Sequence, residues 1–183
     1  MKYIKDIQEP GMGTWYFEID SHGAAYRQMV FHDDGTCISS NRKHERYHFM
    51  LAEHPLDSQE SYYKEISQAE FEDLWQAQLQ LSTDGWHRTK SLFPVGSRVE
   101  GYIEAFFPQG TLINLLEPQA FGITDTAAIK SETPAEWMCP RFRVIADVAG
   151  YDEVNQWVLL TCAEILGSRY EEAEHKWKAL QGE

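Results

Sequence analysis

Histidines in the N-terminal half are the first candidates for chemistry. His44 and His48 are four residues apart, a spacing that ligates zinc when both side chains lie on one face of a helix. This stretch has the pattern of a loop that enters a strand, and no Cys or carboxylate completes a recognisable ligand set. We therefore expect surface histidines here and no metal site.

Two further groups contain the residue types of a catalytic site. His32 precedes Asp33 and Asp34 and could be a general base with carboxylate support, and Cys37 could be a nucleophile beside a histidine. The Asp-Asp-Gly sequence is also what a hairpin turn requires, and a single cysteine is commonly a small core residue. Gly11-Met-Gly13 is half of a dinucleotide-binding fingerprint. We predict no catalytic residue and no cofactor, and the sequence identifies no small-molecule substrate, so we expect a protein that is not an enzyme.

The charge of the chain bears on its partners. The 183 residues have a formal net charge of −13, with 9 Lys and Arg against 15 Asp and Glu in residues 1–90, and 7 against 14 in residues 91–183. Nucleic-acid affinity comes largely from Lys and Arg that neutralise phosphates. The charge therefore favours a basic protein partner over nucleic acid.

Composition indicates a folded protein of the cytoplasm. Hydrophobic residues make up 43% of the chain and aromatic residues 13%, which is ample material for a core. Cys37, Cys139 and Cys162 are odd in number and far apart, as expected of reduced thiols. The N-terminus has no apolar signal region, and no stretch approaches the ~18 apolar residues of a membrane span. We expect no membrane association.

Residues 1–81 have the pattern of an antiparallel strand meander followed by one helix. Alternating apolar and polar residues predict strands over residues 15–19, 24–31, 36–40 and 47–51. Ser67-Gln-Ala-Glu70 is a capping box, so the helix begins there. Phe71, Leu74 and Trp75 fall on one face of this helix and are expected to pack on the sheet.

The same residues carry a resemblance. The order Glu18-Ile-Asp20, Ala25-Tyr-Arg-Gln28, Asp34-Gly35, Leu51-Ala-Glu53 and Glu65-Ile-Ser67, leading into Phe71 and Trp75, is similar to a family of small bacterial domains. The resemblance covers about 75 residues. It implies a strand meander with one helix, and an immunity-like role in bacterial toxin systems.

The C-terminal half predicts a small barrel. Residues 82–91 are polar and without periodicity, and are interpreted as a linker. In residues 92–183 we expect strands over 98–107, 111–116, 121–124, 142–148 and 156–161, with an irregular segment between the third and fourth. Five short strands of this kind suggest an OB-type barrel. A second capping box, Ser168-Arg-Tyr-Glu171, predicts a C-terminal helix, so the fold class is α+β and mainly β.

This half resembles the RNA-binding barrel repeats of the ribosomal protein S-one type. Val95-Gly96, Val99-Glu-Gly101, Gly110, Ile113-Asn-Leu115 and Gly122-Ile123 occur in the order of that family, and the closing segment Val144 to Leu160 follows them. The resemblance implies an RNA-binding face with two aromatic residues and a histidine. Gln109, Leu112 and Asp125 hold those positions, so the stacking platforms that hold RNA bases are missing.

Alternation along the first barrel strand identifies candidate partner-binding residues. Val99, Ile103 and Ala105 are expected to fill the barrel, which places Glu100, Tyr102, Glu104 and Phe106 outside it. The two aromatics either pack under the other domain or the C-terminal helix, which we favour, or form an exposed patch. The bases that could serve a nucleic-acid ligand are Arg98, Arg141 and Arg143.

Together these patterns predict a cytoplasmic binding protein that acts through an acidic protein-binding surface, with an immunity-like, toxin-neutralising role as one specific form. The alternative is a protein that binds RNA or single-stranded nucleic acid with its barrel.

Overall fold

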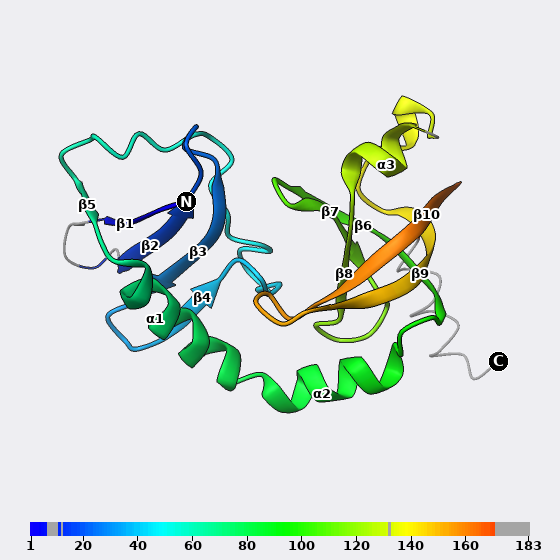
Figure 1. The fold of residues 1–183 in the computed structure, drawn as a ribbon, viewed down its shortest axis with the longest axis horizontal. Coiled ribbons are helices and arrows are strands. Elements are labelled where there is room, and N and C mark those ends of the chain that lie inside the picture. The colour runs from blue at the N-terminus through cyan, green and yellow to red at the C-terminus, as the bar shows by residue number, and fades with distance from the viewer. Residues whose placement is uncertain (7–10, 12, 132, 171–183) are drawn as a thin grey trace. The chain divides into compact units, whose positions relative to one another are not determined.

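A computed structural model describes residues 1–6, 11, 13–131 and 133–170 of the chain (Figure 1). The chain divides into two compact units, Met1–His87 and Arg88–Glu183, called unit 1 and unit 2 below. Each unit contains one sheet, and strands predominate over helices. The fold is therefore α+β and mainly β, as the sequence predicts.

Unit 1 is a five-stranded antiparallel sheet with the strand order β4-β3-β2-β1-β5. Its strands are β1 (Lys2–Asp6), β2 (Thr14–Ile19), β3 (Ala25–Phe31), β4 (Cys37–Ser39) and β5 (Tyr63–Glu65). The predicted strands over 15–19, 24–31 and 36–40 are confirmed. Short polar turns join them, because the carboxylates of Asp20 and Asp34 accept backbone N–H groups two residues further on.

Helix α1 (Gln68–Gln80) covers this sheet and begins as predicted. The Ser67 hydroxyl accepts the N–H of Glu70 at 3.1 Å. The Glu70 carboxylate also binds Lys5 of β1 at 3.1 Å, which fastens the first turn of the helix to the sheet. Phe71, Trp75 and Leu79 are buried in one cluster with side chains of the sheet, so the helix stabilises unit 1 mainly through this apolar face.

The predicted strand over residues 47–51 is wrong. His44 and His48 form an isolated bridge, with N–O distances of 2.7 and 2.9 Å in the two directions, and Tyr47 at its tip is 41% exposed. The two strands that complete the sheet, β1 and β5, were not predicted. Both are short and rich in charged residues, so alternation gives them little signal.

The segment over residues 82–91, predicted to be an irregular linker, is largely helical. Helix α2 (Thr83–Leu92) contains the division between the two units. Trp86 lies in this helix and is only 4% exposed. One buried Trp among polar residues produces no detectable periodicity, although it is enough to anchor a helix of ten residues.

Unit 2 is built on five strands that close in the order β10-β8-β7-β6-β9. They are β6 (Arg98–Phe107), β7 (Gly110–Asn114), β8 (Phe121–Thr124), β9 (Phe142–Asp152) and β10 (Trp157–Arg169). The pair β8 and β10 is parallel, whereas the other pairs are antiparallel. The predicted hairpin of β6 and β7 and the predicted strand at β8 are confirmed.

A bulge in β6 corrects the predicted inward and outward pattern. Ile103 pairs with Ile113, whereas Ala105 pairs with Leu112, so two residues of β6 advance against one of β7. Residues directly opposite in an antiparallel pair share a face. Phe106 therefore shares a face with its partner Thr111. Thr111 lies on the same face of β7 as Ile113, two residues further on, and Ile113 pairs with Ile103, so Phe106 and Ile103 share one face. The predictions that Ala105 shares the inner face of Ile103 and that Phe106 shares the face of Tyr102 are wrong.

Two segments of unit 2 contain more regular structure than predicted. Helix α3 (Thr126–Ser131) and a 3-10 turn (Ala135–Trp137) occupy the connection between β8 and β9. Ser168, predicted to cap a C-terminal helix, lies inside β10, and Gly167 before it has φ 66°. The remainder of the predicted helix, residues 171–183, lies outside the described residues. Among the described residues, no helix has the length and apolar character required to cross a membrane.

Candidate functional site

The four partner-binding candidates on β6 do not form one exposed patch. Glu100 and Phe106 are exposed, Glu104 is half-buried, and Tyr102 is only 7% exposed. The Glu104 carboxylate accepts a hydrogen bond from the Asn114 side chain at 2.9 Å. Glu100 is therefore the one of the four candidates that presents an exposed carboxylate.

Tyr102 is buried and is not part of an exposed patch, and its stacking partner is Tyr170, the residue after β10. The two rings are stacked, with centroids 4.7 Å apart and an interplanar angle of 14°. The Tyr170 N–H donates to the carbonyl of Arg141 at 2.7 Å, which joins the residue after β10 to the residue before β9. Tyr102 therefore has a structural role and is removed from the candidate surface.

Charged side chains from three neighbouring strands form the surface beside Tyr102. The register places Glu100, Ile145 and Glu164 in one row across β6, β9 and β10. The adjacent row contains Arg98 opposite Asp147. The four charged residues of these rows, together with Arg143 of β9, are called the ion-pair face: Arg98, Glu100, Arg143, Asp147 and Glu164.

Carboxylates surround both arginines of the ion-pair face. The Arg143 guanidinium donates to Glu100, with Nε–Oε1 at 2.8 Å, and Arg98 lies 3.1 Å from Asp147 and 3.9 Å from Glu164. Exposed pairs of this kind add little to stability. They do determine the local charge, because three carboxylates face two guanidinium groups.

Arg141 lies apart from these pairs, at the start of β9. Its backbone has φ 74°, and its N–H donates to the carbonyl of Ile103 at 2.7 Å. Its side chain is exposed, with Nε 3.4 Å from the Tyr170 carbonyl. The structure thus brings Arg98 and Arg143 onto one face with acidic neighbours and keeps Arg141 at the edge where β10 ends.

The positions that would hold an RNA-stacking platform have other roles. Leu112 is completely buried. The Asp125 carboxylate accepts N–H groups from Ala127 at 2.7 Å and Ala128 at 3.3 Å, and so caps the start of α3. Gln109 is half-buried in the turn between β6 and β7.

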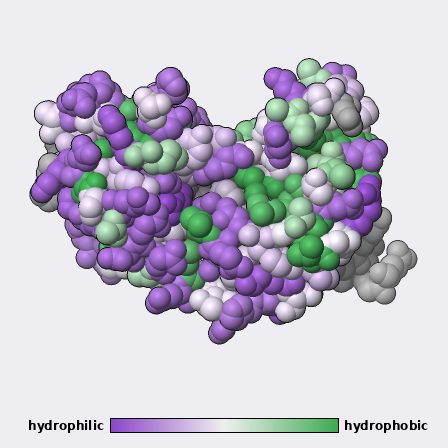
Figure 2. All heavy atoms as spheres, in the orientation of Figure 1, coloured by the Kyte–Doolittle hydropathy of each residue, from purple (hydrophilic) through white to green (hydrophobic). Residues whose placement is uncertain are grey.

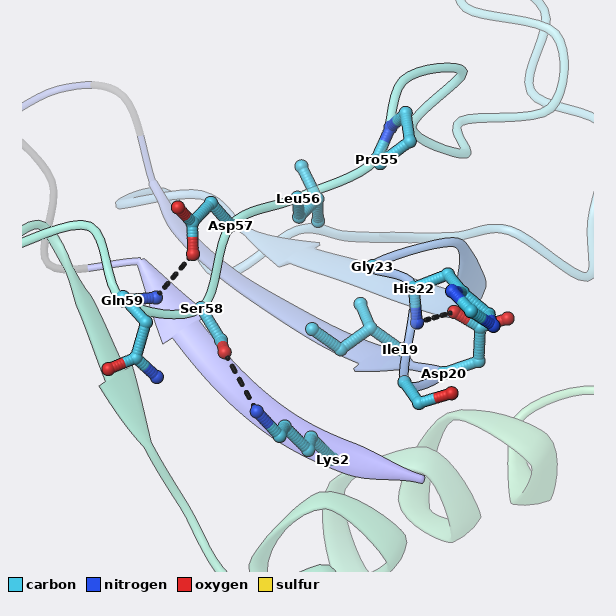
Figure 3. Close-up of a pocket in the computed structure, with 11 residues that line it drawn as sticks. Lys2, Ile19, Asp20, His22, Gly23, Pro55, Leu56, Asp57, Ser58 and Gln59 are labelled. Carbon is cyan, nitrogen blue, oxygen red and sulfur yellow. Dashed lines mark hydrogen bonds between the residues drawn. The ribbon is translucent and has the colours of Figure 1, made fainter.

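Unit 1 has a hollow of about 320 Å³ beside the turn between β2 and β3 (Figure 3). Two carboxylates line it, but both support local turns: Asp20 accepts the N–H groups of His22 and Ala24, and Asp57 accepts that of Gln59. The bond from the His22 amide is the main cause that lowers the pKa of Asp20. An ionised carboxylate committed to backbone amides is a poor general acid or base.

A second hollow in unit 1, of about 660 Å³, brings together several of the residues considered for chemistry. His32, Asp33, Asp34, Cys37 and His44 all line it. Burial raises the pKa of the Cys37 thiol to about 12, so this sulfur is protonated near neutral pH and is a weak nucleophile. Within the described residues, no cluster of three or more His, Cys, Asp or Glu has the arrangement of a metal site.

The most buried charge cluster of unit 1 was missed in the sequence. Arg27 binds Glu18, its direct partner on β2, with Nε–Oε2 at 2.5 Å, and binds Glu72 of α1 with Nη1–Oε2 at 3.0 Å. The guanidinium also lies over the Phe71 and Trp75 rings, 5.0 and 5.2 Å from their centroids. Burial acts to lower the pKa of Arg27, but the bonds to Glu72 and Glu18 outweigh it and raise that pKa..

This cluster joins the sheet to helix α1, because one guanidinium serves a carboxylate on each element. The sequence does contain a signal for this cluster, namely two opposite charges at inward positions of adjacent strands. It was missed because polar residues were expected only on the outer face of the sheet.

Compared with known protein families and with curated proteins, the chain matches no family model and no curated protein.

Proposed function

We propose that the chain is a binding protein, not an enzyme, that recognises a basic protein partner through the ion-pair face of unit 2. The observation that carries the proposal is the excess of carboxylates on that face, where Glu100, Asp147 and Glu164 surround Arg98 and Arg143. A surface with this charge attracts Lys and Arg and repels phosphate. An immunity-like role, in which the face masks a basic toxin, is the specific form that we propose.

Exposed apolar side chains in the same unit support a protein partner. Phe106, Leu116, Val154 and Leu159 are between 38% and 45% exposed. Figure 2 shows hydrophobic atoms gathered over the strands of unit 2, whereas unit 1 is mostly hydrophilic in this view. Protein interfaces combine apolar contact with charged residues at the rim, a mixture that unit 2 offers.

We further propose that unit 2 is a barrel of the OB type. The closed order β10-β8-β7-β6-β9, the single parallel pair of β8 with β10, and helix α3 between β8 and β9 support this assignment. The resemblance to the ribosomal protein S-one type also supports it. Fold does not imply function, so an OB-type scaffold is compatible with a protein partner.

The experiment that tests the proposed function compares two labelled probes of opposite charge, oligolysine and oligouridine, by fluorescence anisotropy. We expect salt-sensitive binding of oligolysine that Glu100→Gln weakens, and no binding of oligouridine. Binding of oligouridine alone would contradict the proposal.

RNA binding by the barrel is the second candidate, and the strand order of unit 2 is the observation that favours it. In that case Arg141 and Arg143 would contact phosphates. Substituting both by Gln would then weaken oligouridine binding and flatten its dependence on salt. Failure of the native chain to bind oligouridine at low salt would reject this candidate.

A further inference from the structure

The larger of the two hollows described in unit 1 has the volume of a small-ligand site. Its volume of about 660 Å³ lies within the ~300–1,000 Å³ of pockets that hold small molecules. The β3–β4 turn contributes His32 and Asp33 to its lining, and the loop closed by the bridge of His44 with His48 contributes Arg46 and Tyr47.

The loop presents a stack of flat groups. The His44 and Tyr47 rings have centroids 5.2 Å apart and an interplanar angle of 24°, and the Arg46 guanidinium carbon lies 5.2 Å from the Tyr47 centroid. The backbone N–H of Arg46 donates to His44 Nδ1 at 3.2 Å, which fixes the imidazole within the loop. Aromatic rings and guanidinium planes are the groups on which nucleobases stack. A planar heterocycle can extend this stack.

The β3–β4 turn supplies hydrogen-bond acceptors. The Asp34 carboxylate is engaged by Thr36, whose N–H and hydroxyl lie 2.9 and 2.7 Å away. Its neighbour Asp33 is exposed and lines the same hollow. An ionised carboxylate only accepts hydrogen bonds and has two oxygens, so it suits two adjacent N–H donors on the edge of one ring.

We propose that this hollow binds guanine, as the free nucleoside or as its monophosphate, with the base added to the stack of His44, Tyr47 and Arg46 and its N–H edge on Asp33. Guanine carries a ring N–H beside an amino group, which matches a carboxylate, whereas adenine presents a ring acceptor beside its amino group. This site lies in unit 1 and is independent of the function proposed for unit 2.

The test is titration of the full chain with guanosine, guanosine monophosphate and adenosine, followed by calorimetry and by amide NMR shifts. We expect guanosine to shift the amides of Asp33 and Tyr47, and to bind at least ~10-fold more tightly than adenosine, because adenosine would leave the Asp33 oxygens without donors. If the natural ligand is the monophosphate, guanosine monophosphate binds more tightly than guanosine, and Arg46→Gln removes this difference in affinity. If the natural ligand is the nucleoside, guanosine and guanosine monophosphate bind with equal affinity, and they remain equal in Arg46→Gln.

Two pairs of matched variants make the test specific. Asp33→Asn and Tyr47→Leu should each weaken guanosine binding by ~10-fold or more. Asp73→Asn on α1 and Tyr62→Leu, which is 48% exposed and does not line this hollow, should leave it unchanged. The proposal would be overturned if guanosine did not bind, or if guanosine and adenosine bound equally well. It would also be overturned if the hollow variants and the control variants lost equal affinity while their NMR spectra stayed dispersed, as expected of folded chains.

Discussion

The Arg143 guanidinium on β9 donates to the Glu100 carboxylate on β6, with Nε–Oε1 at 2.8 Å. This pair joins a residue considered for nucleic-acid binding to one considered for protein binding, and so relates the two functional hypotheses to each other. Arg98 has a similar relationship with Asp147 and Glu164. Because each cation already has an acidic neighbour, phosphate would have to displace a carboxylate from it.

The Tyr102–Tyr170 stack predicts that the end of β10 stabilises the barrel. Tyr170→Ala should lower the free energy of unfolding of unit 2 by about 1–3 kcal/mol, since it removes the stacked pair and exposes Tyr102 to water. Chemical denaturation followed by amide NMR signals of the barrel would measure the loss. Phe106→Ala, at a position 41% exposed, should cost less. An equal or larger cost for Phe106→Ala would contradict this prediction.

The Ser67 cap predicts a smaller effect in unit 1. Ser67→Ala removes the hydroxyl that accepts the Glu70 N–H, and should lower the stability of unit 1 by about 1 kcal/mol. Denaturation followed by signals of α1 would detect the change. Ser21→Ala, in an exposed turn, is the matched control and should have no measurable effect. If both variants were as stable as the native chain, the cap would be energetically neutral.

Arg27 predicts the largest effect on stability. Arg27→Met should cost about 3–5 kcal/mol, because it leaves the carboxylate of Glu18 buried without its cation. The double variant Arg27→Met with Glu18→Gln should recover part of that loss, since no uncompensated charge then remains at this pair. Thermal and chemical denaturation of the two variants give the comparison. A double variant less stable than Arg27→Met would show that the loss is one of packing.

Cys37 predicts a dependence on pH. Burial raises the folded pKa of its thiol from 9.0 to about 12. Folding therefore favours the protonated thiol, so the contribution of this group to stability is present below pH 9 and is lost as pH rises toward 12. The stability of Cys37→Ala should accordingly fall less steeply with pH in this interval than that of the native chain.

Alkylation supplies an independent measurement of the same thiol. At pH 8, iodoacetamide should modify the exposed Cys162 before Cys37, as peptide mass spectrometry would detect. Modification of Cys37 first would indicate an activated thiol and would revive the interpretation of Cys37 as a nucleophile.

The sequence predicts those parts of the fold where a local signal is strong. The helix cap at Ser67, the turn at Asp34-Gly35 and the β6–β7 hairpin each combine periodicity with a turn or cap residue, and the structure contains all three. The bulge after Ile103 has no such signal, because it is a shift in the register of β6 against β7 and depends on the pairing of the two strands. The faces of Ala105 and Phe106 were mispredicted for that reason.

The candidate sites were harder to predict because their members come from distant segments. Arg98 and Glu164 are 66 positions apart and become neighbours only through the pairing of β6, β9 and β10. The hollow that contains Cys37 and Tyr47 depends on the His44–His48 bridge, where alternation had indicated a strand. At both sites the residue types could be recognised as candidates in the sequence. Which of these residues lie together could be seen only in the tertiary structure.

The most direct test of the proposed function is the affinity of oligolysine for a charge-matched pair of variants, measured by anisotropy at low and at physiological salt. Glu100→Gln with Glu164→Gln removes two carboxylates from the ion-pair face, whereas Asp73→Asn with Glu136→Gln removes two exposed carboxylates elsewhere. We predict that the first pair weakens binding by ~10-fold or more and the second leaves it within about twofold. Equal losses in the two variants would contradict the account, because binding would then follow net charge and not this face.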